Sequence, residues 1–340
     1  MQRQNFLRLI ISSILLFICL MSVCFNSMAQ TTGKIDSSRQ VTQILHTYGL
    51  NPASPFISRV RETPDSVLNM FRDAGMSPKN HVLTEEERLT VEKAFAALPP
   101  LHQRVLKEHL RSITFLDNMP NTALTSTVNG KDSYRLYDIT VRAEILHQNA
   151  SEWLTGKERG CFKTQGSSLS ISVEAGTLDA IVYVLMHEGT HVVDGALSLL
   201  PVNEPGRKLS ESSTANSFIR GVWNEPTIFA KPYRNTMLDS TRFRQGGKVL
   251  SINRAEAVYK ALEKTPFASL YGTSSQHEDL AEYLTIYHFT QKLQLPFRII
   301  IHDKEKEVFV YEPMKSKLGK SRIKCMKIFY SQNEHGFSGV

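Results

Sequence analysis

A run of apolar residues from Ala180 to Met186 has no polar face when it is drawn as a helix. An all-round apolar pattern is typical of a helix that crosses a protein core. His187, Glu188 and His191 follow without a break. A buried histidine needs a polar partner or a metal ion. The pattern therefore predicts a core helix whose second half carries histidines that are bound by such partners.

Helical and strand patterns follow one another in blocks along the rest of the chain. Apolar residues at helical spacing predict helices over 41–48 and 65–74, a helix that opens at 84–87 and ends before Pro99, and another over 101–110. Alternation then predicts strands over 112–116, 122–128 and 136–141. A helix begins at Glu278, and strands over 297–302 and 307–311 precede a short helix over 324–329. The stretch 201–247 is predicted to be a long loop, and it is a candidate wall or lid over a cleft.

The two histidines and the glutamate have the spacing of a catalytic zinc site. On a helix, His187 and His191 project from one face about one turn apart. Both imidazoles can therefore reach one tetrahedral Zn²⁺ ion. Glu188 points into the same cleft, where it can take a proton from a zinc-bound water. The alternative is a core helix with two satisfied histidines.

A catalytic zinc ion has three protein ligands and leaves its fourth position to water. A histidine six residues after His191 supplies the third ligand in one known arrangement, but Leu197 occupies that position. An acidic residue on another helix remains. Glu278 and Glu282 lie four residues apart on one face of a predicted helix, so one would bind the metal while the other orients a histidine. Their mutual repulsion predicts a positive group nearby, and the alternative is an ordinary solvated acidic helix start.

These two segments resemble the gluzincin metallopeptidases and, among them, the lethal-factor-like proteases. In that family a His-Glu-x-x-His-x-Val-Asp helix is followed by a tyrosine, six residues, a zinc-binding glutamate, three residues and a second glutamate. The first pattern is matched here by His187, Glu188, His191, Val193 and Asp194. The second is matched by Tyr271, Glu278 and Glu282. The resemblance covers about residues 177–290.

The resemblance implies both a fold and a ligand set. It implies His187, His191 and Glu278 as zinc ligands and Glu188 as the general base. The implied fold is α+β and zincin-like, with a sheet lobe, a helical lobe and the zinc cleft between them. The corresponding domains are a signal peptide over 1–29, a helical N-terminal region over 30–110 and a zincin-like catalytic domain over 111–340.

Further roles are implied around the zinc. Tyr271 is implied to stabilise the oxyanion with its hydroxyl, and Glu282 and Asp194 are implied to hold the ligands in place. Zincins usually bind the substrate backbone against a sheet edge, by strand addition. The small and β-branched residues Ala123–Thr125 are the candidate edge for substrate binding, namely Ala123, Leu124 and Thr125. An interior strand is the alternative.

The N-terminus has the pattern of an export signal. Arg3 and Arg8 precede an apolar run over 9–23. Ser27 and Ala29 place small residues at the −3 and −1 positions, so cleavage is expected after Ala29. A membrane anchor is the alternative, although the run is short for a span of about 20 residues. The expected location is the periplasm or the extracellular space, without stable membrane insertion after cleavage.

The charge, the aromatic residues and the cysteines limit the kinds of binding partner that the sequence favours. The formal net charge is +7, and its surplus is concentrated over 315–324, which is either an anion-binding patch or a solvated helix face. The basic residues are not interleaved with aromatic residues, so the sequence does not favour a nucleic-acid partner. Cys161 and Cys325 remain after signal cleavage, so one disulfide is possible in an oxidising compartment.

The sequence therefore predicts an exported zinc metallopeptidase that acts on a peptide or protein substrate, with no nucleic-acid partner. Two alternatives stay open. One is a non-catalytic, zinc-stabilised binding protein, and the other is a zinc amidase that acts on a non-protein substrate. Glu188 and Tyr271 speak against the first alternative, because a purely structural zinc site needs neither residue.

Overall fold

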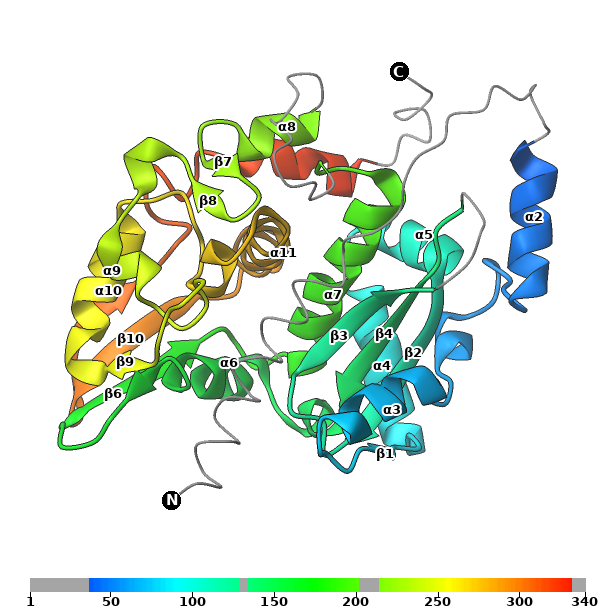
Figure 1. Cartoon of the computed structure of the whole chain (residues 1–340), viewed down its shortest axis with the longest axis horizontal. Coiled ribbons are helices and arrows are strands. Elements are labelled where there is room, and N and C mark those ends of the chain that lie inside the picture. Colours follow the sequence, from blue (N-terminus) through cyan, green and yellow to red (C-terminus); the bar gives the residue numbers. More distant parts are fainter. Residues whose placement is uncertain (1–36, 129–133, 202–213, 332–340) are drawn as a thin grey trace.

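Two β-sheets flank a pair of helices in the middle of the molecule, in an α+β fold (Figure 1). The computed structural model describes residues 37–128, 134–201 and 214–331. The predicted signal peptide over 1–29 therefore lies outside the described residues. Within the described part, no helix is long and apolar enough to cross a membrane.

The α-helices are α2 (Ser37–Thr47), α3 (Asp65–Asp73), α4 (Glu85–Ala96), α5 (Pro100–His109), α6 (Ala150–Arg159), α7 (Ala180–Leu197), α8 (Thr214–Ile219), α9 (Thr236–Asp239), α10 (Ala255–Glu263) and α11 (Gln276–Tyr287). Shorter helical segments are η1 (Phe56–Arg59), η2 (Ala143–His147), η3 (Lys231–Tyr233), η4 (Ile252–Arg254), η5 (Tyr271–Thr273), η6 (His288–Lys292) and η7 (Ile323–Tyr330). The strands are β1 (Lys79–Asn80), β2 (Leu110–Asp117), β3 (Ala123–Thr127), β4 (Tyr137–Arg142), β5 (Phe162–Lys163), β6 (Leu169–Glu174), β7 (Trp223–Glu225), β8 (Ile228–Phe229), β9 (Leu250–Ser251), β10 (Arg298–Asp303) and β11 (Lys306–Tyr311).

The larger sheet contains four strands in the order β1-β2-β4-β3. β2 and β4 are parallel, and the other two pairs are antiparallel. β3 is thus an edge strand within the described residues, so the edge interpretation of this segment is confirmed. A second sheet, in the order β11-β10-β6, is antiparallel throughout, and it lies on the far side of α11 from the larger sheet (Figure 1).

Helix α7 occupies the core, as its apolar sequence predicts. Residues Ala180–His187 are all buried, and the helix packs against α4, α5, α6, α11 and β3. Gly189 permits the close approach of α5, because a Cβ atom there would lie 3.2 Å from Cδ2 of His102 and 3.3 Å from Cδ1 of Leu106. The apolar half of α7 therefore anchors its polar half inside the molecule.

Local capping explains where two of the helices begin. The Thr84 hydroxyl accepts from the Glu87 amide, and the Glu87 carboxylate accepts from the Thr84 amide, so α4 opens with a capping box. Ser275 caps α11 by accepting from the Glu278 amide at 3.2 Å. The sequence predicts the opening of α4 at 84–87, whereas it predicts a helix from Glu278 and α11 begins two residues earlier, at Gln276.

The helical N-terminal elements divide between the main core and two smaller clusters, because α3 packs in a cluster with Leu116 and Met119 and α2 packs in a cluster with Leu136. α4 and α5 contribute to one large hydrophobic cluster with α7, α11, the four-stranded sheet and the three-stranded sheet. The predicted boundary after residue 110 falls at the first residue of β2 and stays a prediction.

Two predictions about irregular segments were wrong. The stretch 201–247 is not one long loop, because its described part contains α8, α9 and the hairpin of β7 and β8. The basic stretch 315–324 is not a solvated helix face, because η7 begins only at Ile323 and Arg322 is buried. Arg322 forms hydrogen bonds with Asp279 on α11 at 2.5 and 2.9 Å, and it leaves solvent to do so because Asp279 is itself buried.

Candidate metal centre

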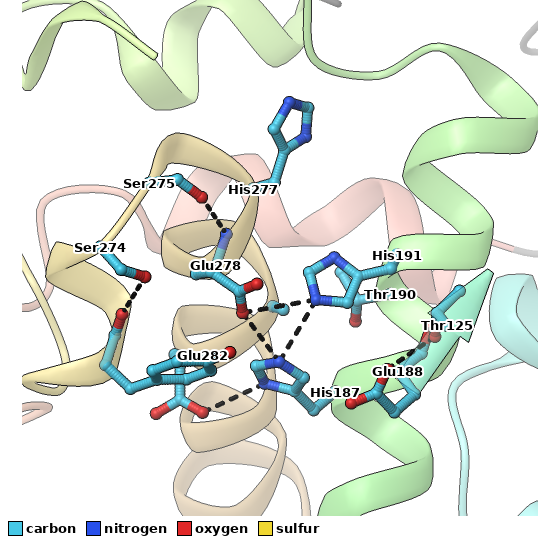
Figure 2. A network of polar contacts seen from close by, with 12 residues as sticks. Thr125, His187, Glu188, Thr190, His191, Ser274, Ser275, His277, Glu278 and Glu282 are labelled. Atoms are coloured by element: carbon cyan, nitrogen blue, oxygen red, sulfur yellow. Dashed lines mark hydrogen bonds and ion pairs between the residues drawn. The ribbon is translucent and has the colours of Figure 1, made fainter. Parts of the chain in front are cut away.

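Three predicted ligands meet where α7 and α11 pack together (Figure 2). Nε2 of His187 lies 3.0 Å from Oε2 of Glu278 and 3.3 Å from Nε2 of His191. Nε2 of His191 lies 3.4 Å from the same Glu278 oxygen. Two nitrogens and one oxygen therefore form a compact triangle of possible metal ligands.

The size of this triangle fits a tetrahedral ion. Nitrogen and oxygen ligands lie about 2.0–2.2 Å from Zn²⁺, so two of them at a tetrahedral angle are about 3.4 Å apart. The observed separations of 3.0, 3.3 and 3.4 Å are close to that spacing. His187, His191 and Glu278 can therefore hold a metal ion after shifts of a few tenths of an ångström.

Glu282 lies one turn after Glu278 and contacts the back of His187. Its Oε1 is 3.1 Å from Nδ1 of His187 and accepts a hydrogen bond from Nζ of Lys157 at 3.0 Å. Its Oε2 accepts from the hydroxyls of Ser269 at 2.5 Å and Tyr183 at 3.2 Å. A carboxylate held in this way fixes the ring orientation of a ligand histidine and favours the tautomer that presents Nε2 to a metal.

The charges at the site favour a cation between the carboxylates. Burial opposes ionisation of Glu278, but the positive charges of His191 and His187 outweigh it and hold the pKa of Glu278 well below its ordinary value. Burial is likewise outweighed at Glu282, where Lys157 and His187 lower the pKa to about 2. Burial lowers the pKa of His187, yet Glu278 and Glu282 raise it to about 10. A divalent ion can supply the positive charge that protons provide in its absence.

Tyr271 is the first residue of η5, and its half-buried side chain lies against His187 of α7. Its ring stacks on the His187 ring with centroids 5.6 Å apart, and the ammonium of Lys157 lies 4.5 Å from the centre of the Tyr271 ring. Burial and the negative charges of Glu278 and Glu188 raise the pKa of Tyr271 well above its ordinary value. The phenol therefore keeps its proton at neutral pH and can act as a hydrogen-bond donor.

Glu188 faces the edge strand β3, on the other side of the ligand pair. Its Oε2 accepts a hydrogen bond from the Thr125 hydroxyl at 2.6 Å (Figure 2). Burial lowers the pKa of His191, but the negative charge of Glu278 and, to a smaller extent, that of Glu188 raise it. Glu188 is therefore near the ligands without being one of them.

The register of β3 determines which backbone groups face the open edge. The Arg142 amide donates to the Thr122 carbonyl, and the Val128 amide donates to the Leu136 carbonyl. Hydrogen-bonded pairs alternate along an antiparallel ladder, so residues 124 and 126 bond to β4. The amides and carbonyls of Ala123 and Thr125 are consequently directed away from β4, whereas the Leu124 backbone is used within the sheet.

Asp194 does not support the ligand histidines. Its Oδ1 accepts from the Leu200 amide at 2.7 Å, and its Oδ2 lies 2.6 Å from Nδ1 of His277. The His277 side chain points away from the triangle (Figure 2). Asp194 therefore closes the C-terminal end of α7 and connects it to α11, and the implied role as a support of the metal ligands is wrong.

Lys157 is a site residue that sequence reasoning did not identify. The proximity of Glu278 and Glu282 predicted a nearby positive group, and the ammonium of Lys157 fills that role. Its helix, α6, carries no zinc-site motif, and only the packing of α6 against α7 brings it to Glu282. The hydroxyls of Tyr183 and Ser269 were also missed, because their contacts with Glu282 depend on how α7 and the segment before α11 pack against it.

Cys161 and Cys325 do not form the possible disulfide. Cys161 and Cys325 are both free thiols. Cys161 is buried, with a raised pKa caused mainly by that burial, and Cys325 lies 3.4 Å from the hydroxyl of Ser217. The pairing therefore contributes nothing to the described fold.

The chain has no recognised relative in three comparisons with known proteins, since none of the protein-family models, curated proteins and solved structures matches it.

Proposed function

We propose that this protein is an exported, zinc-dependent peptidase with a zincin-like arrangement of sheet lobe, helical lobe and metal cleft. One observation carries the proposal, namely the triangle of His187, His191 and Glu278. Glu188 lies on α7 between the two ligand histidines. We infer zinc because two imidazoles and one carboxylate form a ligand set typical of catalytic zinc sites.

The chemistry follows from the placement of the side chains. A zinc ion held by the three ligands would supply a Lewis acid for the peptide carbonyl and would lower the pKa of a water molecule at the site. Glu188 takes the proton of the attacking water and passes it to the leaving amine. Tyr271 donates a hydrogen bond from its protonated hydroxyl to the oxyanion.

The substrate backbone is proposed to bind along β3. Ala123 and Thr125 direct an amide and a carbonyl each toward the open edge, beside the helix that carries Glu188. A peptide that adds as a further strand forms backbone hydrogen bonds with these groups, so its binding does not depend on any single side chain. This geometry favours a peptide substrate over a small amide, which has no strand to add.

The test combines metal analysis with cleavage of an unbiased peptide library by the full-length protein after export. We expect one equivalent of zinc, internal cleavage of peptides, loss of cleavage after chelation and recovery on addition of zinc. Bound zinc without cleavage would favour the non-catalytic binding protein instead. Hydrolysis restricted to non-peptide amides would favour the amidase, and protein without metal affinity would overturn the proposal.

A further inference from the structure

The carboxylate of Glu188 is connected directly to the edge strand. The Thr125 hydroxyl donates to Oε2 at 2.6 Å, and the Glu188 main-chain carbonyl is a more distant neighbour of that hydroxyl at 3.5 Å. This contact occupies one carboxylate oxygen, so Oε1 is left to exchange the proton during hydrolysis. A hydrogen bond to a charged acceptor is stronger than one between neutral groups, so the contact can select one side-chain orientation.

The fold fixes the direction of the Thr125 side chain. Side chains alternate along a strand, and Leu124 packs into the cluster of Val67, Leu68, Phe71, Leu116 and Met119 on the face of the sheet that α3 covers. Ala123 packs instead with the main core on the α7 side. The register with β4, in which Thr125 pairs with Ile139, therefore aims the hydroxyl at α7.

The same residue thus has two connections. Its side chain holds Glu188, and its amide and carbonyl face the edge where a peptide is proposed to bind. We propose that Thr125 is a positioning residue that places Glu188 for proton transfer and links occupancy of the edge to that placement. The inference rests on the proposed function for its catalytic part, whereas the contact itself can be tested without activity.

The first experiment is a double-mutant cycle on the metal-free protein. Thr125→Val removes the hydroxyl with little change in shape, and Glu188→Ala removes its acceptor. We expect Thr125→Val to raise the unfolding equilibrium constant about tenfold or more when Glu188 is present, and far less in the Glu188→Ala background. Additive effects of the two substitutions would show that the contact does not position Glu188, whether or not the protein is a peptidase.

The second experiment measures peptide hydrolysis and zinc content in three variants. Thr125→Val should lower kcat about tenfold to a hundredfold with KM and zinc stoichiometry unchanged, because a displaced base slows only the chemical step. Thr125→Ser keeps the hydroxyl and should recover most of the rate. Thr127→Val makes the same change at an exposed position of the same strand and should stay near the wild-type rate.

These outcomes separate the two proposals. An active wild-type protein whose Thr125→Val variant is equally active would overturn the role of Thr125 alone. A serine variant as slow as the valine variant would also overturn it, because the hydroxyl would then not be the group that matters. A wild-type protein with no peptidase activity would overturn the proposed function, while the double-mutant cycle would still decide whether Thr125 holds Glu188.

Discussion

The two flanks of the His187 and His191 pair are built very differently. On the α11 flank, Glu282 contacts His187 and is bound by an ammonium and two hydroxyls in a buried setting. On the β3 flank, Glu188 is held through a hydrogen bond from a half-buried threonine beside an open strand edge. Several contacts fix the orientation of a ligand, whereas a lightly held carboxylate can accept a proton and then deliver it elsewhere.

In the proposed peptidase, the α11 flank would support metal binding and the β3 flank would support proton transfer. A metal ligand must be placed within a narrow range of geometry by residues that are themselves locked by packing. A proton carrier must reach both the attacking water and the leaving group. The arrangement therefore predicts that damage to the α11 flank affects metal affinity and stability, while damage to the β3 flank affects rate.

The largest effect is expected at Glu188. Glu188→Gln keeps the size of the side chain and an oxygen that can accept from Thr125, but it removes the proton acceptor. Hydrolysis should fall by at least the 10²–10⁴-fold typical of general-base loss, with one equivalent of zinc retained. Steady-state kinetics and elemental analysis of the same preparation check this. A variant that cleaves at the wild-type rate would rule out Glu188 as the base.

The next largest effect separates the two glutamates of α11. Glu278→Gln removes a charged ligand and should release zinc under mild chelation. Glu282→Gln keeps an oxygen behind His187 but removes the negative charge that supports this ligand, a type of loss that typically costs 10–100-fold in metal affinity or activity. Titration of both variants with one chelator gives the order directly. If Glu282→Gln lost zinc more readily than Glu278→Gln, the ligand would be Glu282 and the triangle would be misassigned.

A smaller effect is expected from Lys157, through the acid stability of the metal-free protein. The pKa of Glu282 in the folded protein, about 2, lies below its ordinary value. The ionised carboxylate therefore contributes to the free energy of unfolding above about pH 4.5, and this contribution is lost as the pH falls towards 2. That contribution is of the order of 3 kcal/mol. Lys157→Met removes a main cause of the shift and should lower stability at neutral pH while flattening this acid dependence.

Urea denaturation of the metal-free protein between pH 7 and pH 2.5 measures the difference. Lys260→Met is a matched control, because Lys260 pairs with Glu256 at an exposed helical position and should change little. Parallel pH profiles for wild type and Lys157→Met would mean that the ammonium does not stabilise the ionised Glu282.

Sequence reasoning succeeded where the determining interactions are local. The opening of α4 at 84–87 and the apolar core helix α7 follow from residues within a few positions of each other. The His187 and His191 pair also follows from helical spacing alone. Glu278 required a second pattern far along the chain, and the structure brings it to the histidines as the ligand prediction requires.

What the sequence did not reveal depends on packing between distant segments. Lys157 and Glu282 are 125 positions apart, and Thr125 and Glu188 are 63 apart. Thr125 was predicted only as part of a backbone edge, because the direction of its side chain depends on how β3 packs against α7. Asp194 was assigned from a motif, but its partner His277 depends on the packing of two helix ends.

The smallest effect on the metal is expected at Asp194, which lies on the ligand helix but outside both flanks. Its contacts are with the Leu200 amide and His277, so Asp194→Asn should lower the free energy of unfolding by about 1–3 kcal/mol, the usual cost of weakening a buried charged hydrogen bond. Zinc affinity and kcat should stay within a few-fold of wild type, because neither ligand histidine loses a partner. The same chelator titration used for Glu282→Gln provides the comparison. A tenfold or greater loss of zinc affinity in Asp194→Asn would show that the end of α7 also holds His191, and the distinction between the two flanks would then have to include a third support.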